Sequence, residues 1–179
     1  LNHVTVLSGV GVGGGSLTYA NTLPIPKQHF FNSGSWKNLN DWENVLKPFY
    51  NIAYKMLGAT ENPKLFSADL TLKKIAKDLN KATSFETSKV AVHFGEEGKT
   101  VKDPYFNGKG PDRTGCIYCG ACMTGCRHNS KNTLDKNYLY LAQQYGTEIL
   151  AESEVINVST LKSKSGKDGY KVDFKTGSG

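Results

Sequence analysis

A dense run of glycines near the start of the chain limits the folds that this sequence can adopt. The run Gly9–Gly14 follows the β-branched stretch Val4–Leu7 and has the letters Gly-x-Gly-x-x-Gly of a dinucleotide-binding fingerprint. That fingerprint needs a helix, a second strand and an acidic residue about 20 positions further on. Pro24 and Pro26 interrupt any such helix, and Asp41 lies inside a helical pattern. The run is therefore not the first βαβ unit of a nucleotide-binding fold.

The densest part of the run is still suited to close contact with a ligand. Glycine lets backbone amide groups approach an anionic oxygen without a clash from Cβ. The stretch Gly13–Ser16 stands immediately before the apolar Leu17. We therefore favour backbone contact between this loop and a ligand, and a flexible glycine turn is the alternative.

The rest of the chain alternates between helical and strand-like patterns. The expected elements are helices over 40–58, 70–79 and 134–145, and strands over 90–94, 148–151, 155–161 and 170–174. Pro48 is expected to kink or split the first helix, and Ser67 or Asp69 is expected to cap the second. The polar, glycine-containing segment 165–169 predicts a hairpin turn between the last two strands. This mixture predicts an α/β fold with an inserted α+β portion.

Composition and charge exclude several classes of protein. With 38% hydrophobic and 21% charged residues, the chain has an ordinary globular composition. The net charge of +6 is spread along the sequence without a basic stripe and stacking aromatics, so no nucleic-acid partner is expected. No apolar run approaches the ~20 residues of a transmembrane segment. We expect the chain to be an internal part of a longer protein, whose compartment stays open with the cytoplasm favoured.

All the cysteines of the chain lie in one loop and so cannot link distant segments of a secreted fold. They are Cys116, Cys119, Cys122 and Cys126. Their spacing is that of a bacterial ferredoxin run, in which thiolates three positions apart wrap one face of an iron–sulfur cluster.

Two features of the sequence argue against a cluster: there is no second cysteine run, and Arg127 stands where the ferredoxin pattern has proline. A four-thiolate zinc site normally needs two separated knuckles. The sequence narrowly favours a structural loop, reduced or locally cross-linked. The four cysteines nevertheless stay candidate ligands of an iron–sulfur cluster, with His128 as a candidate auxiliary ligand.

Three motifs resemble the glucose–methanol–choline oxidoreductases, and within them the cholesterol-oxidase-like flavoproteins that carry a cysteine-rich loop. The motifs are Gly11–Leu23 (GVGGGSLTYANTL), Asp103–Phe106 (DPYF) and Gly115–Leu139, which contains the four cysteines. The resemblance extends from about residue 6 to about residue 174. It implies FAD, held by a nucleotide-binding domain whose first βαβ unit precedes the glycine loop.

The resemblance also implies a division of the chain and a set of residues that contact the cofactor. Residues 1–25 would be the FAD-contacting glycine loop, 26–128 part of a substrate domain with the cysteine-rich loop, and 129–179 the return helix and strands of the FAD domain. The cofactor contacts would be Gly13, Gly14, Gly15 and Ser16, with Asn21 as a weaker transfer and the main chain of Val155 against adenine.

The chemistry that the resemblance implies is the oxidation of an alcohol, with a sterol-like substrate favoured. Hydride would pass to flavin N5 and a base near the C-terminus of the longer protein would take the hydroxyl proton, with oxygen or another acceptor receiving the electrons. No histidine of this chain matches that base; they are His3, His29, His93 and His128. Several aromatic and apolar residues would form either a substrate pocket or ordinary core: Trp36, Trp42, Phe49, Tyr50 and Met56. An iron–sulfur electron-transfer or binding module is the alternative function.

Overall fold

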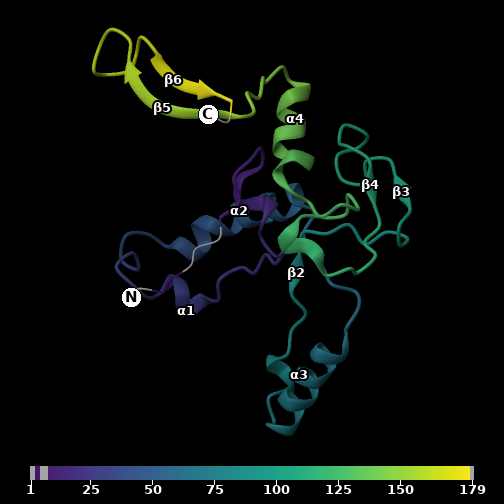
Figure 1. The fold of residues 1–179 in the computed structure, drawn as a ribbon. Coiled ribbons are helices and arrows are strands. Elements are labelled where there is room, and N and C mark those ends of the chain that lie inside the picture. The colour runs from purple at the N-terminus through teal and green to yellow at the C-terminus, as the bar shows by residue number, and fades with distance from the viewer. Residues whose placement is uncertain (1–2, 5–7, 178–179) are drawn as a thin grey trace.

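The computed structural model describes residues 3–4 and 8–177, and Figure 1 shows their arrangement. Residues 5–7 of the expected strand Val4–Leu7 lie outside the described residues. The helices are α1 (Gln28–Phe31), α2 (Trp42–Met56), α3 (Ser67–Asp78) and α4 (Tyr138–Gln144), with 3-10 turns η1 (Gly14–Leu17), η2 (Ala82–Ser84), η3 (Ala121–Thr124) and η4 (Leu134–Lys136). The strands are β1 (Thr60–Glu61), β2 (Lys89–Val90), β3 (Thr100–Val101), β4 (Arg113–Thr114), β5 (Ser153–Thr160) and β6 (Tyr170–Thr176).

The strands of the described residues pair into two-stranded antiparallel sheets, β1 with β2, β3 with β4 and β5 with β6. Helices and small antiparallel sheets together are compatible with the α/β expectation. An FAD-binding domain with an inserted α+β portion remains a prediction, as does the division at residues 25 and 128.

The first long helix differs from its sequence-based expectation at Pro48. Asp41 precedes α2 as its cap, and its side chain accepts a hydrogen bond from the amide of Asn44 at 3.4 Å. The helix continues through Pro48 to Met56, so the predicted split is wrong. Proline removes one hydrogen bond of the helical ladder, and the remaining bonds and the cap keep the helix in one piece. The expected stop at Gly58 is confirmed, with φ +56°.

The second long helix begins one residue earlier than its predicted caps require. Ser67 is the first residue of α3, and Phe66 occupies the cap position. Asp69 lies in the first turn, where its Oδ2 accepts the amide of Phe66 at 2.9 Å. Asp69 therefore stabilises the helix N-terminus from inside the helix, with its charge at the positive end of the helix dipole.

The expected strand over 90–94 is shorter than predicted but forms the centre of the molecule. Only Lys89–Val90 belongs to a sheet. Beyond it, the amide of Ala91 donates to the carbonyl of Asn21, and the amide of Asn132 donates to the carbonyl of Ala91, both at 2.8 Å. Isolated bridges join Val90 to Thr22 and Val92 to Lys131. Segments from the start, the middle and the later part of the chain thus lie side by side.

The region predicted as a helix over 134–145 is divided in two. The short turn η4 ends at Lys136, and α4 begins at Tyr138. Between them Asn137 leaves the helical conformation with φ −138° and ψ −94°, and its Oδ1 accepts the amide of Tyr138 at 2.7 Å. Asparagine side chains compete for backbone hydrogen bonds in this way, which ends one helical turn and begins the next.

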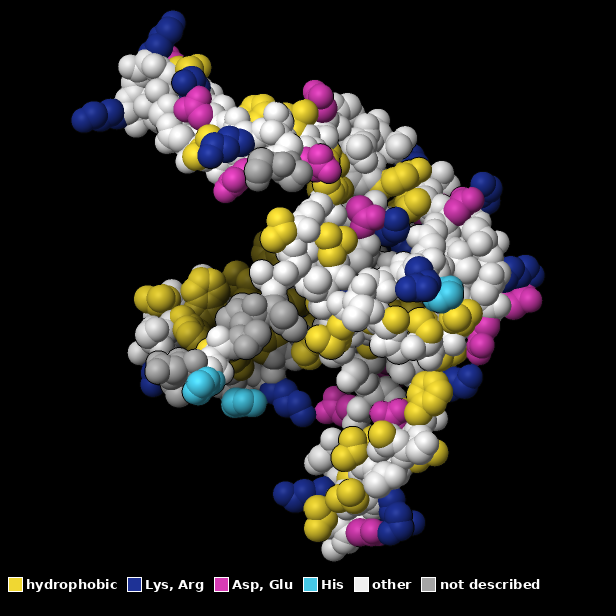
Figure 2. Space-filling view, viewed as in Figure 1, with side chains coloured by type: hydrophobic (Ala, Val, Ile, Leu, Met, Phe, Trp, Pro, Cys, Tyr) yellow, Lys and Arg dark blue, Asp and Glu magenta, His cyan; other side chains and the backbone are white. Residues whose placement is uncertain are grey.

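The predicted C-terminal hairpin is confirmed. Strands β5 and β6 pair from Ser153 opposite Thr176 to Thr160 opposite Tyr170, with an irregularity between Val155 and Asn157. Figures 1 and 2 show the hairpin as an arm that stands away from the body. The predicted strand over 148–151 does not form: residues 148–150 have no regular structure, and Ala151 begins the turn that leads into β5. Among the described residues, no helix has the length and apolar character that crossing a membrane requires.

One carboxylate organises the loop that carries the second motif. Asp103 accepts backbone amides from Tyr105, Phe106, Gly108 and Gly110, at 2.8 to 3.0 Å. Partial burial alone would raise the pKa of Asp103, but these hydrogen bonds outweigh it and hold the pKa below the ordinary value of 3.8. The charged carboxylate is thus the internal scaffold of residues 103–110.

The substitution Asp103→Asn tests this role. An amide has one acceptor oxygen, so some backbone amides lose their partner, and we expect the free energy of unfolding at pH 7 to fall by about 1–3 kcal/mol. Because the folded-state pKa is depressed, the contribution of Asp103 is present above its unfolded value and is lost as the pH falls through the folded pKa. Wild type and variant should therefore converge below pH 3.8 in urea titrations.

The matched control is Asp112→Asn. Asp112 pairs with the exposed Lys102 at 2.9 Å, so its loss should change the free energy of unfolding by less than about 0.5 kcal/mol. Equal stability of Asp103→Asn and wild type at pH 7 would contradict the assignment.

Candidate functional site

The glycine loop is held in place by one serine. Gly13 is buried and has φ +108°, a conformation that favours glycine. The hydroxyl of Ser16 donates to the carbonyl of Gly13 at 2.6 Å and accepts the amide of Leu134 at 2.9 Å. Ser16 therefore fixes the turn and attaches it to the segment that follows the cysteines. The structure thus gives Ser16 a structural role, and its contact with a cofactor stays a prediction.

The next two glycines leave free space beside the backbone. A Cβ added at Gly14 or Gly15 would meet no atom within 4 Å. Among the described residues, the Gly15 amide has no hydrogen-bond acceptor. An accessible backbone donor next to open space is the arrangement that a glycine loop needs to hold an anionic group.

A cavity of about 710 Å³ lies between this loop and the base of the hairpin. The loop contributes Val10, Gly11 and Val12, and the other wall is formed by residues 150–154 and Gly177. Figure 2 shows the hairpin separated from the body by an open hollow. The volume falls within the range of cofactor sites in proteins. Val155 follows this wall directly, in β5, with its side chain 58% exposed.

None of the predicted cofactor contacts, Gly13–Ser16, Asn21 and Val155, belongs to the lining of this cavity. Asn21 lies in the central pairing of segments instead. It has φ +62°, and its carbonyl accepts the amide of Ala91. Asparagine tolerates this left-handed conformation better than most residues. The observed geometry gives Asn21 a place in the central pairing of segments, and its cofactor role stays a prediction.

Lys131 is the residue that joins the predicted parts of the site. Its side chain is almost fully buried, at 2% exposure. Its Nζ donates to the carbonyl of Leu17 at 3.0 Å and to the carbonyl of Cys122 at 2.8 Å, and it lies 4.6 Å from the ring centre of Tyr19. One ammonium group therefore connects the glycine loop to the cysteine loop.

A second buried cation lies beneath the same segment. Arg113 is 1% exposed and donates through Nε to the carbonyl of Asn129 and through Nη2 to the carbonyl of Lys131. Its Nη1 is buried without a partner among the described atoms. Burial lowers the pKa of Arg113, and burial together with the nearby guanidinium lowers the pKa of His93. His93 is therefore neutral at pH 7.

Burial also shifts the pKa values of groups around Lys131. Burial lowers the pKa of Lys131, although the neighbouring Cys122 and Cys126 side chains act in the opposite direction. Burial, with the charge of Cys122 nearby, raises the pKa of Tyr19 to about 12. Tyr19 stays protonated, and its hydroxyl donates to the carbonyl of Asn132 at 3.2 Å.

The four cysteines line a single small cavity of about 20 Å³. All are unpaired by disulfide bonds, and Cys119 is exposed. The amide of Tyr118 donates to Cys116 Sγ at 3.3 Å, and the amide of Ser130 donates to Cys126 Sγ at 3.4 Å. In the part of the chain that the structure describes, no three side chains of ligating type are arranged closely enough to hold a metal ion as they stand.

The two end cysteines have opposite pKa shifts. Burial, reinforced by the other three thiols, raises the pKa of Cys116. Burial also acts upward on Cys126, but backbone amides of Lys131, Ser130 and His128 outweigh it, so the pKa of Cys126 is lowered. The amide donors therefore favour a thiolate at the end of the run.

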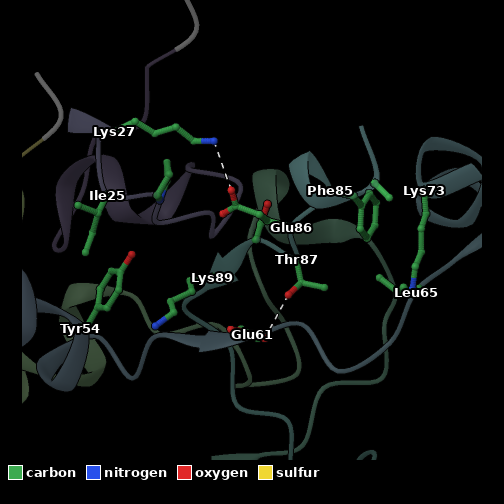
Figure 3. A pocket seen from close by; sticks show the side chains of 13 residues that line it. Ile25, Lys27, Tyr54, Glu61, Leu65, Lys73, Phe85, Glu86, Thr87 and Lys89 are labelled. Carbon is green, nitrogen blue, oxygen red and sulfur yellow. Dashed lines mark hydrogen bonds and ion pairs between the residues drawn. The ribbon is translucent and has the colours of Figure 1, made fainter. Parts of the chain in front are cut away.

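Another cavity, of about 730 Å³, lies between residues 24–27, α2, the middle of α3 and residues 82–89 (Figure 3). Charged side chains occupy much of its lining: Lys27, Glu61, Lys73, Glu86 and Lys89. Lys27 pairs with Glu86 at 3.3 Å across it. This charge suits polar solutes better than a sterol.

The aromatic residues of the helical middle gather on a partly open surface. Phe31 is buried, with ring centres of Phe30 and Tyr50 at 5.7 and 6.5 Å, and Trp36 lies 5.3 Å from Phe30. Phe49 is 61% exposed. A cavity of about 260 Å³ opens here, lined by Ile25, Pro26, Phe31, Glu43, Lys47, Tyr50 and Asn51. The sequence predicted either a substrate pocket or ordinary core for the aromatic and apolar residues of this region. In the described residues they do not form a closed core.

Sequence reasoning placed Lys131 in a motif but gave it no role. A lysine is almost never fully buried without a partner, so its sequence pattern suggests a solvated charge. No local sequence signal identifies it, because its neighbours Ser130 and Asn132 are polar too, and only the structure shows that all three are 1–2% exposed. Arg113 was missed for the same reason.

The substitution Lys131→Met tests whether this lysine supports the site. Methionine fills a similar volume but leaves the carbonyls of Leu17 and Cys122 without their donor, so we expect the free energy of unfolding to fall by about 2 kcal/mol. Lys109→Met, at an exposed position, is the control and should stay within about 0.5 kcal/mol of wild type. Similar urea midpoints for both variants would argue against a central role of Lys131.

Comparisons with known proteins agree with the resemblance found in the sequence. Over 175 residues the chain is 49% identical to a protein named cholesterol oxidase from Acinetobacter baumannii, covering 95% of the chain and 32% of that relative. Over 160 residues it is 47% identical to a protein of the same name from Mycobacterium tuberculosis, covering 87% of the chain and 28% of that relative. No family model and no solved structure matches. The chain thus spans about a third of the length of these relatives and is similar, over most of its own length, to one part of cholesterol oxidases.

Proposed function

We propose that this chain is the part of an FAD-dependent oxidoreductase, acting on a sterol-like alcohol, that presents the glycine loop to the cofactor. The observation that carries the proposal is the cavity of about 710 Å³ between Val10–Val12, which immediately precede Gly13–Ser16, and the base of the hairpin. The similarity to cholesterol oxidases supplies the class of substrate. The two walls of this cavity come from segments that are more than a hundred positions apart in the sequence.

The residues present fit a large anionic cofactor. The open space at Gly14 and Gly15 lets the backbone approach a phosphate or a ring edge, and the Gly15 amide is available to donate. Gly13 and Ser16 fix the shape of the loop. The register irregularity after Val155 interrupts the pairing with β6, which supports a role for the main chain there. Asn21 is the least supported member of the proposed set.

FAD would supply the hydride acceptor, which takes two electrons and a proton equivalent from the alcohol carbon. The chain's own contribution is to bind and orient. The glycine loop would exclude water from one face of the cofactor, and a base would take the hydroxyl proton. We assign that base to no residue of this chain, since none of its histidines lines the cavity beside the glycine loop. Oxygen or another acceptor would then receive the electrons.

The apolar surface around α1 and α2 is the part that we propose for the sterol. Phe30, Trp36 and Phe49 are each more than a third exposed, and the rings of Phe30 and Trp36 lie 5.3 Å apart. The neighbouring cavity is lined by Ile25, Phe31 and Tyr50, among others. A rigid, mostly hydrocarbon substrate would be stabilised by covering such a surface.

The function is tested with the full-length protein that contains this chain. Under anaerobic conditions, cholesterol should bleach the visible absorbance of the bound flavin, because two electrons reach the cofactor. Cholestane, which has the same skeleton without the hydroxyl, should leave the absorbance unchanged. A purified protein without flavin, or a flavin that cholesterol and other sterol alcohols do not reduce, would contradict the proposal.

The contact between loop and cofactor is tested by Gly14→Val and Gly15→Val. The added side chains would occupy the open space that the cofactor needs, so we expect either variant to lose its flavin, measured as the flavin-to-protein ratio. Gly108→Val is the matched control for Gly14→Val. Both glycines have positive φ, at +84° and +54°, and open space at Cβ, but Gly108 lies in the loop of Asp103. A normal ratio in Gly14→Val, or equal loss in Gly108→Val, would count against the contact.

A further inference from the structure

Two buried cations lie near the cysteine run: Lys131 lines the four-cysteine cavity, and Arg113 donates to the carbonyls of Asn129 and Lys131. Lys131 and Arg113 are 2% and 1% exposed, and neither forms an ion pair with a carboxylate in the described residues. Transferring a charge out of water is strongly unfavourable unless an opposite charge or hydrogen bonds compensate. Carbonyl oxygens satisfy part of their hydrogen bonding but supply no negative charge.

Around Lys131, the thiol groups are the acidic groups placed to supply that charge. The Lys131 ammonium group donates to the carbonyl of Cys122 at 2.8 Å, and Lys131 lines the cavity that all four cysteines share. Arg113 does not line that cavity, and Asp135 as well as Cys126 lies near its guanidinium group. The buried positive charge of Lys131 thus lies against the cysteine loop, which favours an anionic occupant there.

The loop also carries amide donors directed at sulfur. Tyr118 and Ser130 donate their amides to Cys116 Sγ and Cys126 Sγ. Hydrogen bonds to sulfur stabilise a thiolate and are one of the features that tune metal–sulfur centres. Donors therefore stand at both ends of the cysteine run, whereas an apolar structural loop would need none.

We propose that Cys116, Cys119, Cys122 and Cys126 bind one iron–sulfur cluster, whose negative charge is offset by Lys131 and Arg113. Each thiol gives up its proton as its sulfur–iron bond forms, and no change of oxidation state is required for binding. This assignment reverses the narrow preference of the sequence for a structural loop, because the buried cations could not be seen in the sequence. It does not depend on the flavin or the sterol assignment.

Binding requires the cysteine loop to open. The present cavity of about 20 Å³ holds little more than one water molecule, so the sulfurs must rearrange around the cluster. The turn η3 between the second and fourth cysteines is bounded by Gly120 and Gly125, with φ +73° and +104°. A Cβ at either glycine would meet no atom within 4 Å, so space surrounds both ends of this turn. Metal binding and local folding are commonly coupled in this way.

The test uses the full-length protein, purified without oxygen. Iron and acid-labile sulfide are measured on the protein, and low-temperature electron paramagnetic resonance is recorded after dithionite reduction. We expect about four iron and four sulfide per chain and a signal from the reduced cluster. Zinc in place of iron, or metal-free protein with four titratable thiols or with disulfides, would overturn the proposal. Flavin content is measured separately, so failure of the flavin assignment leaves this result interpretable.

Variants identify the ligands and the role of the cations. Cys122→Ser should lose most of the iron and sulfide, whereas Thr124→Ser, in the same turn, should keep them. Lys131→Met should shift the midpoint potential of the cluster to a more negative value, because a nearby positive charge favours the reduced, more anionic state. Lys131→Arg should restore it. A cluster retained in Cys122→Ser would contradict the ligand assignment. An unchanged midpoint potential in Lys131→Met would contradict the proposed role of the lysine charge.

Discussion

The double hydrogen bond of the Lys131 ammonium group is the interaction on which the rest of this structure depends. It joins the carbonyl of Leu17, at the end of the glycine loop, to the carbonyl of Cys122, in the cysteine loop. The backbone of the same residue bridges Val92 and accepts a hydrogen bond from Arg113. Because Lys131 is buried, each of these contacts is shielded from water and is correspondingly strong.

The interior around this residue is unusually polar. Among residues 3–4 and 8–177, the buried apolar side chains are Phe31, Val90, Ala91 and Val92, whereas the buried polar ones are Arg113, Ser130, Lys131, Asn132 and Asn137. A polar interior specifies its geometry closely, since a displaced partner leaves a buried group without a hydrogen bond. We infer that this network, rather than apolar burial, sets the relative positions of the two loops.

The sequence predicted well those features that depend on local chemistry. The hairpin over β5 and β6 and the helix α2 with its stop at Gly58 follow from periodicity and from residues with special backbone preferences. The predictions failed where contacts with residues distant in sequence determine the local structure. The segment after Val90 pairs with Asn21 on one side and with residues 130–132 on the other. Its short strand therefore depends on distant segments and could not be predicted from the local sequence.

The candidate site shows the same division. The glycines were predicted from their conformational freedom, and the cysteines from their spacing. Lys131 and Arg113 were not, because a basic residue in a polar stretch is indistinguishable from a solvated one until the fold surrounds it. The cavity beside the glycine loop also requires residues 150–154, which no local pattern connects to Val10–Val12.

The long sequence separation of these contacts bears on how the protein is made. The hydroxyl of Ser16 accepts a hydrogen bond from the amide of Leu134, which is 118 positions further along the chain. The carbonyl of Leu17 accepts one from the ammonium group of Lys131, which is 114 positions further along. At typical rates of synthesis the glycine loop therefore waits on the order of ten seconds for its partners to emerge from the ribosome. During that interval the loop has no fixed shape from these contacts, and a nascent chain interrupted before residue 131 would lack them altogether. The ability to hold a cofactor would thus arise late in translation, after most of this chain has been synthesised.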